Sequence, residues 1–151
     1  MRSPLSVDNR GFTLMEVIVV LILMAIFAML AVSRQPHTDM TLKAGAEVLK
    51  SHLRYAQARA MSSDSIWGLS YDSGNGNYWL FRNEASQRVT LPGETQNSVN
   101  LMAKGISLSG ALPLVFDAWG RPNLGADATI TLAKAGTTET ITIRRNTGFI
   151  Q

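Results

Sequence analysis

The side chains that could do chemistry are few in this sequence, and their spacing does not suit catalysis. Cysteine is absent, which excludes a disulfide, a thiolate metal site and a cysteine nucleophile. The two histidines, His37 and His52, both fall in a helical segment, where solvated surface positions are the simpler interpretation. The sequence also contains no G-x-S-x-G motif, whose serine a histidine could activate as a nucleophile. The pattern therefore predicts no catalytic triad.

Metal and phosphate sites are not indicated either. Calcium needs clustered oxygen ligands, and the acidic residues after residue 60 are nowhere closer in sequence than Asp64 and Asp72. A phosphate-binding loop of the G-x-x-x-x-G-K-[ST] form does not occur. We predict that the protein is not an enzyme and that it has no metal and no cofactor.

One acidic residue is unusual in its surroundings. Glu16 lies near the start of an apolar segment, Phe12 to Val32, in which Thr13 is the only other polar residue. An ionised side chain inside a membrane helix costs several kcal/mol unless it is paired. The sequence places no Lys, Arg or His between Phe12 and Ser33. We therefore expect the partner of Glu16 to come from another chain or from a new amino terminus.

The apolar segment has the length of a membrane-spanning helix. Its 21 residues would extend about 31 Å as a helix, close to the thickness of the hydrocarbon core of a bilayer. A buried core helix is one alternative. A cleaved secretory signal is another, because Ala31, Val32 and Ser33 form a small-x-small pattern. The apolar run is longer than usual for such a signal, and a carboxylate inside its start is atypical.

Length and charge limit the remaining possibilities. The 151 residues leave about 90 to 120 for a single globular domain once a membrane segment is set aside. Lys and Arg number 14 against 11 Asp and Glu, a net charge of +3 without runs of one sign. Charge alone therefore does not indicate nucleic acid as a partner. Basic residues on both sides of the apolar segment leave its orientation undecided.

A second helical pattern follows the apolar segment. Pro36 interrupts the chain between the two patterns and predicts a kink or a break. Apolar residues then recur at steps of three and four, which places them on one stripe of a helix: Leu42, Ala46, Leu49, Leu53, Ala56 and Ala60. We expect this stripe to pack on a sheet of the same chain rather than in a two-chain coiled coil.

After residue 63 the pattern changes to that of β-strands. Residues 65–71 and 78–82 are predicted as strands joined by the glycine-rich connection 72–77. Alternation around Ile130 and around Ile141 predicts two half-buried antiparallel strands, with a glycine-centred turn at residues 135–138. Residues 83–110 are weakly patterned, so irregular structure is expected there apart from a short strand at 105–109.

The N-terminal residues resemble a known family. The string Arg10-Gly11-Phe12-Thr13-Leu14-Met15-Glu16 is similar to the signature of type IV prepilins. The resemblance implies that a prepilin peptidase and N-methyltransferase cuts between Gly11 and Phe12 and methylates Phe12. Glu16 then becomes the fifth residue of the mature chain, where the family's glutamate pairs with the N-terminal amine of a neighbouring subunit.

The C-terminal half makes the resemblance more specific. The segment from Leu112 to Pro122, the strands at 129–133 and 140–145, and Thr147-Gly148 look like the GspH/FimT group, the H-type minor pseudopilins of type II secretion and the FimT-type minor pilins. The stretch Phe-Asp-x-x-Gly-Arg-Pro within it also has a structural interpretation. Gly120 allows a tight turn, and Pro122 fixes the chain beyond it.

These observations together predict an α+β protein with a long kinked N-terminal helix on a C-terminal antiparallel β-sheet domain. The expected divisions are a leader at 1–11, a membrane-spanning and filament-core helix at 12–33, an amphipathic second half at 34–63 and a β domain at 64–151. The resemblance implies a single-pass protein of the bacterial inner membrane with its β domain in the periplasm. It also implies assembly into a type II secretion pseudopilus with the major and other minor pseudopilins.

Two alternatives of other classes remain. One is a FimT-type minor pilin of a type IV pilus that binds DNA for uptake. Members of that type share a basic Gly-Arg-x-Arg near the C-terminus, where this chain has Gly148-Phe149-Ile150-Gln151. Arg144 and Arg145 are expected on a strand, where only one can face a given side, so DNA binding is disfavoured. The other alternative is a soluble β protein released by signal peptidase after Ser33.

Overall fold

The computed structural model describes residues 13–32 and 37–151. The chain divides into an N-terminal unit, Met1–Pro36, and a C-terminal unit, His37–Gln151. The predicted leader, the cleavage site between Gly11 and Phe12, and the predicted kink at Pro36 lie outside the described residues. These three features therefore remain predictions.

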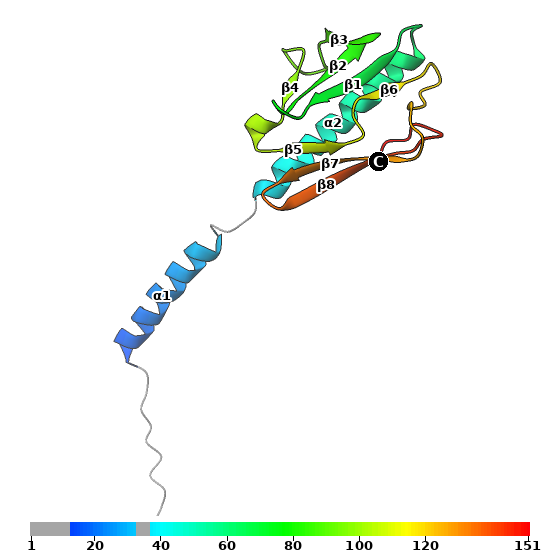
Figure 1. Ribbon diagram of the computed structural model, residues 1–151. Helices are drawn as coiled ribbons and strands as arrows, with labels where there is room; N and C mark the ends of the chain where they lie inside the picture. Colours follow the sequence, from blue (N-terminus) through cyan, green and yellow to red (C-terminus); the bar gives the residue numbers. More distant parts are fainter. Residues whose placement is uncertain (1–12, 33–36) are drawn as a thin grey trace, which may run out of the picture. The chain divides into compact units, whose positions relative to one another are not determined.

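The N-terminal unit contains helix α1, Leu14–Val32 (Figure 1). Thr13 caps it, because its carbonyl oxygen accepts the N–H groups of Glu16 and Val17, at 3.0 and 3.2 Å, and its Oγ1 also accepts the Glu16 N–H, at 3.3 Å. The side chains described for this unit, residues 13–29, are all exposed within the chain. Among the described residues, no helix combines the length and the apolarity needed to cross a membrane.

The C-terminal unit begins with helix α2, His37–Met61. The six apolar residues of the predicted stripe are all buried: Leu42, Ala46, Leu49, Leu53, Ala56 and Ala60. The helix ends two residues before the predicted boundary. Ser62 and Ser63 turn their hydroxyl groups back onto the carbonyl oxygen of Arg59, and serine side chains that bond the backbone in this way favour helix ends over helix interiors.

The first sheet is antiparallel and has five strands. They are β1 (Trp67–Asp72), β2 (Asn77–Arg82), β3 (Glu84–Val89), β4 (Val99–Asn100) and β6 (Leu114–Phe116). Their order is β3-β2-β1-β6, and β4 pairs with β2. The predicted hairpin is present, with Leu69 opposite Leu80, although β1 starts two residues later than predicted.

The second sheet has three antiparallel strands in the order β5-β7-β8. They are β5 (Ser107–Gly110), β7 (Ala128–Lys134) and β8 (Thr137–Ile143). The predicted glycine-centred turn is confirmed, because Ala135 and Gly136 both have positive φ, of 48° and 86°, as in the type I′ turns that join tight hairpins.

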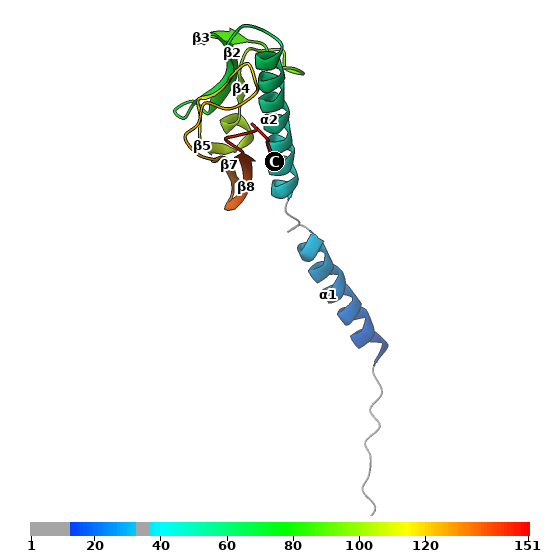
Figure 2. The same ribbon diagram turned by 90° about the vertical axis from the view of Figure 1, so that its right-hand side faces the viewer.

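One hydrophobic core is shared by the helix and both sheets. Figure 2 shows α2 on one side of the C-terminal unit and the strands on the other, and the helix contacts β1 and β6 of one sheet and β7 and β8 of the other. The buried helix stripe belongs to the same cluster as Leu69, Leu80, Ile130 and Ile141. The α+β prediction is therefore confirmed, and the stripe packs on sheets of its own chain instead of forming a coiled coil.

The prediction of irregular structure between residues 83 and 110 was wrong in part. β3 occupies part of this segment, and β4 with a short 3-10 helix, Met102–Lys104, occupies another. All but the last of the β3 side chains are exposed. A strand with neither face buried has no alternation of apolar and polar residues, so its sequence carries no strand signal.

Candidate assembly and binding surfaces

Glu16 lies in the first turn of α1, at the third helical position after the capping Thr13. Its backbone is fixed by the cap, while its side chain is exposed among the apolar side chains of the helix. Leu14 and Met15 before it are 79% and 70% exposed. A helix that is apolar on all sides needs lipid or other helices around it, and Glu16 would be the polar group inside that environment.

A tight turn follows β6 in the C-terminal unit. The Asp117 carboxylate accepts the backbone N–H groups of Trp119 and Arg121, at 2.9 and 2.8 Å, and the Arg121 Nε–H, at 3.1 Å. Desolvation alone would raise the pKa of the Asp117 carboxyl, but these donors outweigh it and lower the pKa. Gly120 has a φ of 75°, so the predicted turn at this glycine is confirmed.

A second loop lies beside this turn and corrects the prediction for the arginine pair. β8 ends at Ile143, so Arg144 and Arg145 are not strand residues. The Arg144 carbonyl oxygen accepts the Gly148 N–H at 2.8 Å and closes a loop over residues 144–148. The Asp127 carboxylate binds the side chain of one arginine and the backbone of the other. It accepts a hydrogen bond from Nη1–H of Arg144 at 2.6 Å and from the backbone N–H of Arg145 at 2.8 Å. Both bonds lower the pKa of the Asp127 carboxyl.

One side chain of α2 ties the two loops together. Gln57 donates from Nε2 to the carbonyl oxygen of Gly120 at 2.7 Å and to that of Gly148 at 3.0 Å. One turn earlier, Arg54 donates to the carbonyl oxygen of Ile150 at 3.1 Å. The apolar stripe predicted the helix, but the sequence alone did not indicate that polar residues beside the stripe would position both loops.

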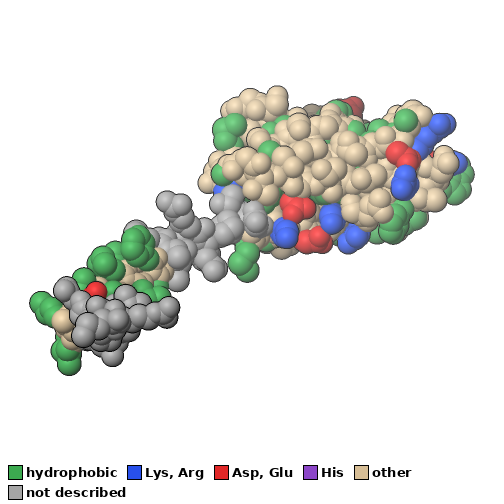
Figure 3. All heavy atoms as spheres, turned by 90° about the horizontal axis from the view of Figure 1, so that it is seen from below, with side chains coloured by type: hydrophobic (Ala, Val, Ile, Leu, Met, Phe, Trp, Pro, Cys, Tyr) green, Lys and Arg blue, Asp and Glu red, His purple; other side chains and the backbone are tan. Residues whose placement is uncertain are grey.

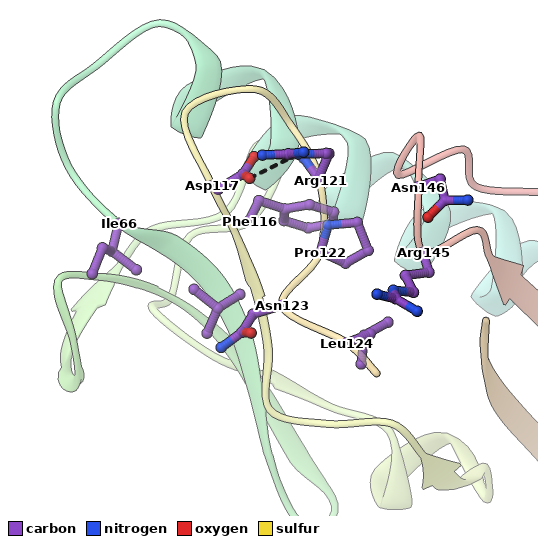
Figure 4. Close-up of a pocket in the computed structure, with 10 residues that line it drawn as sticks. Ile66, Phe116, Asp117, Arg121, Pro122, Asn123, Leu124, Arg145 and Asn146 are labelled. Carbon is purple, nitrogen blue, oxygen red and sulfur yellow. Dashed lines mark hydrogen bonds and ion pairs between the residues drawn. The ribbon is translucent and has the colours of Figure 1, made fainter. Parts of the chain in front are cut away.

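The two loops border a cleft of about 620 Å³. Figure 4 shows Phe116 and Pro122 beside each other on its wall and the Arg145 side chain extending from the neighbouring loop toward Leu124. Ten residues line the cleft: Ile66, Val115, Phe116, Asp117, Arg121, Pro122, Asn123, Leu124, Arg145 and Asn146. A second hollow of about 460 Å³ shares Arg121 and Asn146 with it and adds Trp119 and Thr147.

Large apolar side chains are exposed around the same loops. Trp119 is 74% exposed and Phe149 is 59% exposed. The guanidinium carbon of Arg121 lies 5.1 Å from the centre of the Trp119 ring. Figure 3 shows basic and hydrophobic side chains gathered at one end of the C-terminal unit. Exposed tryptophan and arginine are common at the centres of protein interfaces.

His52 is not the surface histidine that the sequence predicted. It is 1% exposed, with Nδ1 at 2.9 Å from the Tyr78 hydroxyl and Nε2 at 3.1 Å from the Pro92 carbonyl oxygen. The carbonyl oxygen can only accept, so Nε2 carries the proton and Nδ1 accepts from the Tyr78 hydroxyl. Desolvation is the main reason that the pKa of His52 is lowered. The His37 side chain lies outside what the structure describes.

The described residues contain no group of three or more His, Cys, Asp or Glu side chains that could hold a metal ion. The predicted processing residues Gly11 and Phe12 lie outside the described residues, so of the predicted site only Glu16 has a described position. The surfaces that remain are the apolar helix with its carboxylate and the cleft between the two loops.

Comparison with known protein families assigns both ends of the chain. Residues 7–32 match the prokaryotic N-terminal methylation motif, and residues 45–148 match the family described as type II transport protein GspH. The chain belongs to the GspH family. The resemblance to H-type minor pseudopilins and FimT-type minor pilins that the sequence indicated is therefore confirmed.

Individual relatives of this GspH-family chain come from several bacteria. A pilin-like protein of Thermus thermophilus, PilA1, is 27% identical over 145 residues, which cover 89% of this chain and 93% of the relative. The minor pseudopilin EpsH of Vibrio cholerae has the same fold at 16% identity, with a TM-score of 0.58 over 73% of this chain and 94% of EpsH. The type IV minor pilin FimU of Pseudomonas aeruginosa is 20% identical, with a TM-score of 0.57 over 77% of this chain and 91% of FimU.

The N-terminal motif and the GspH domain together indicate a membrane-anchored subunit of a pseudopilus or pilus. The motif also implies processing by a prepilin peptidase. Family membership indicates a structural subunit.

Proposed function

We propose that this GspH-family chain is a minor pseudopilin, a structural subunit of the pseudopilus of a type II secretion system, and that it catalyses no reaction. The observation that carries the proposal is α1, whose described side chains, those of residues 14–29, are all exposed and form an apolar surface that contains one carboxylate. The mature chain begins at Phe12 after removal of residues 1–11, and Phe12 is N-methylated. Residues 12–33 hold it in the inner membrane, with the C-terminal unit in the periplasm, until it enters the filament.

Glu16 gives this assembly its specificity. Residues 12–33 contain no Lys, Arg or His, so a cation for Glu16 must come from elsewhere. The methylated amine of Phe12 in a neighbouring subunit is such a cation. Pairing within a bundle of apolar helices removes the cost of an isolated buried charge, so subunits are most stable when they are correctly assembled.

Substitution of Glu16 tests this proposal. Glu16→Ala is expected to leave the protein in the membrane fraction and to reduce its recovery in sheared filaments by about tenfold or more, since loss of one buried partner costs about 3 kcal/mol or more. Glu47→Gln is a matched control because Glu47 is an exposed acidic residue of α2, paired with Lys50. Recovery of Glu16→Ala in filaments at the level of the unsubstituted protein would contradict the proposal.

The intact mass of the mature protein tests the processing step. Cleavage between Gly11 and Phe12 predicts a chain that starts at Phe12 and carries one additional methyl group. Release by ordinary signal peptidase after Ser33 would give a chain that is shorter by 22 residues and unmethylated. Replacement of Gly11 is expected to leave the leader attached, whereas the release model predicts no effect.

The second candidate function is that of a FimT-type minor pilin that binds DNA. The exposed Arg121 side chain beside Trp119 favours it, since affinity for DNA rests on cations that contact phosphates. The C-terminal residues do not supply the basic motif of that type, and Gln151 is instead paired with Thr142 of β8 through two backbone hydrogen bonds of 3.0 Å. A gel-shift experiment with duplex DNA at several salt concentrations distinguishes the two functions. A shift that weakens steeply with salt would favour the pilin.

A further inference from the structure

We propose that the cleft between the two loops is a docking site for an extended acidic segment of a partner polypeptide, one that places a carboxylate beside an apolar side chain. Arg145 is the residue that carries this inference. Among the described residues, none accepts a hydrogen bond from its guanidinium group, and its only hydrogen bond is made by its backbone N–H. Figure 4 shows the guanidinium within the cleft.

The other charges around the cleft are already paired. Asp117 binds Arg121, and Asp127 binds Arg144, in ion pairs of 3.1 and 2.6 Å. Each carboxylate also accepts backbone N–H groups, and both have lowered pKa values, so both are ionised at neutral pH. The charge left over is that of Arg145. A guanidinium group binds a carboxylate or a phosphate through two parallel hydrogen bonds, and apolar residues beside Arg145 in the cleft favour the carboxylate of a polypeptide.

The walls of the cleft define what must accompany the carboxylate. Ile66 is 51% exposed in its lining and Leu124 is half-buried where the Arg145 side chain ends, so both offer apolar surface, while Phe116 and Pro122 are buried behind that surface. The amide side chains of Asn123 and Asn146 are exposed along its edge and can donate to an oxygen ligand. A ligand that matches this lining has an apolar side chain next to its carboxylate.

The extent of the hollow surface favours a segment that passes across it over a chain terminus. The cleft and the second hollow share Arg121 and Asn146, so the surface continues from Arg145 to the exposed ring of Trp119. A volume of about 620 Å³ is more than one side chain fills. The inference rests on the proposed function in one respect, because the partner would be another subunit of the filament.

Peptide binding to the full-length chain in detergent tests the inference. The probe is a fluorescent peptide, blocked at both ends, in which glutamates alternate with leucines. Fluorescence anisotropy is expected to show saturable binding that Arg145→Gln weakens about tenfold or more. Arg145→Lys is expected to weaken it less, because the charge is kept and the planar pair of donors is lost. Lys104→Gln is the matched control, since Lys104 is an exposed cation of the Met102–Lys104 helix and does not line the cleft.

Other probes separate the competing occupants. A peptide with glutamine in place of glutamate is expected not to bind, and a free C-terminal carboxylate on that peptide is expected not to restore binding. Equal binding of the glutamine peptide, unchanged binding by Arg145→Gln, or a preference of the cleft for duplex DNA would each overturn the proposal. Thermal unfolding of each variant verifies that it is folded. Because this test needs no filament, its failure is distinct from a failure of Glu16→Ala to block assembly.

Discussion

At the scale of one residue, the buried side chain of His52 has both ring nitrogens hydrogen-bonded to neutral groups. Its two ring nitrogens join three parts of the C-terminal unit, since His52 lies on α2, Tyr78 on β2 and Pro92 in the connection after β3. Burial also raises the pKa of the Tyr78 hydroxyl, so this group stays protonated and donates to the histidine. The sequence could not predict this contact because its partners are 26 and 40 residues away.

At this scale we first predict that the folded state loses stability in acid because of His52. Its pKa in the folded state lies below the ordinary histidine value of 6.5, so as the pH falls the unfolded chain takes up the proton first. The free energy of unfolding is therefore highest above pH 6.5 and decreases as the pH falls below that value. Glu94, which raises the pKa of His52, and Lys104, which lowers it, are the charged groups that act on it. Thermal unfolding between pH 5 and pH 8 measures the effect.

His52→Gln is the variant that isolates this contribution. Its amide can donate to Pro92 and accept from Tyr78, but it does not titrate, so the dependence on pH in this range is expected to flatten. An equally steep dependence in His52→Gln would contradict the assignment.

Tyr78→Phe gives a second prediction at this scale. The substitution removes the donor to the buried Nδ1 of His52 and leaves that nitrogen unsatisfied, which is expected to cost about 1–3 kcal/mol in the free energy of unfolding. Denaturant unfolding followed by tryptophan fluorescence measures it. Tyr55→Phe, at a partly buried tyrosine of the same core, is the control. A loss no larger than that of the control would contradict the hydrogen bond.

At the scale of elements, the position of β6 depends on a glycine in β1. Gly68 lies opposite Val115 in the ladder between the two strands. A Cβ atom there would collide with the backbone oxygen of Leu114 and would lie 2.7 Å from Cζ of the Phe81 ring. Only glycine therefore allows β6 to pair this closely with β1 while Phe81 covers the same position.

Gly68→Ala is therefore expected to destabilise the protein by about 1–3 kcal/mol, as overpacked cores generally do. Gly125→Ala is the control, because a Cβ atom at Gly125 meets nothing within 4 Å. Thermal unfolding of the two variants compares them directly. Equal stability of Gly68→Ala and the unsubstituted protein would mean that β6 can move away from β1 at little cost.

Elements of four or more residues with at least one buried face were predictable, and the others were not. The stripe from Leu42 to Ala60 predicted α2 and its packing, and the alternation around Ile130 predicted β7. β3 has no buried face, and β6 has only three residues, so neither carries a periodic signal. The cleft could not be predicted because Ile66, Arg121 and Arg145 come together only through the pairing of distant strands and the hydrogen bonds of Gln57.

At the scale of the whole molecule, residues 40–151 alone are expected to form a soluble monomer. The buried residues of the core all lie within this range, and the stripe of α2 is covered by the sheets of the same chain. Exposed apolar side chains remain, but Met102 stands on a different element from Trp119 and Phe149, and the group around the two loops is small beside the covered stripe. Sedimentation velocity measures the state of association. Stable dimers that Leu49→Ala and Leu53→Ala abolish would mean that the stripe is shared between two chains.

The attachment of both sheets to one helix also determines how this unit carries mechanical load. In a filament, a pull transmitted from the anchoring segment would enter this unit at residue 37, at one end of the axis of α2. The six stripe residues from Leu42 to Ala60 are packed along most of that axis. A pull along that axis would load all six contacts in shear at once, instead of loading one contact after another as in peeling. Resistance to forced unfolding is governed by the unfolding rate, so these six contacts are expected to determine how well the unit withstands tension.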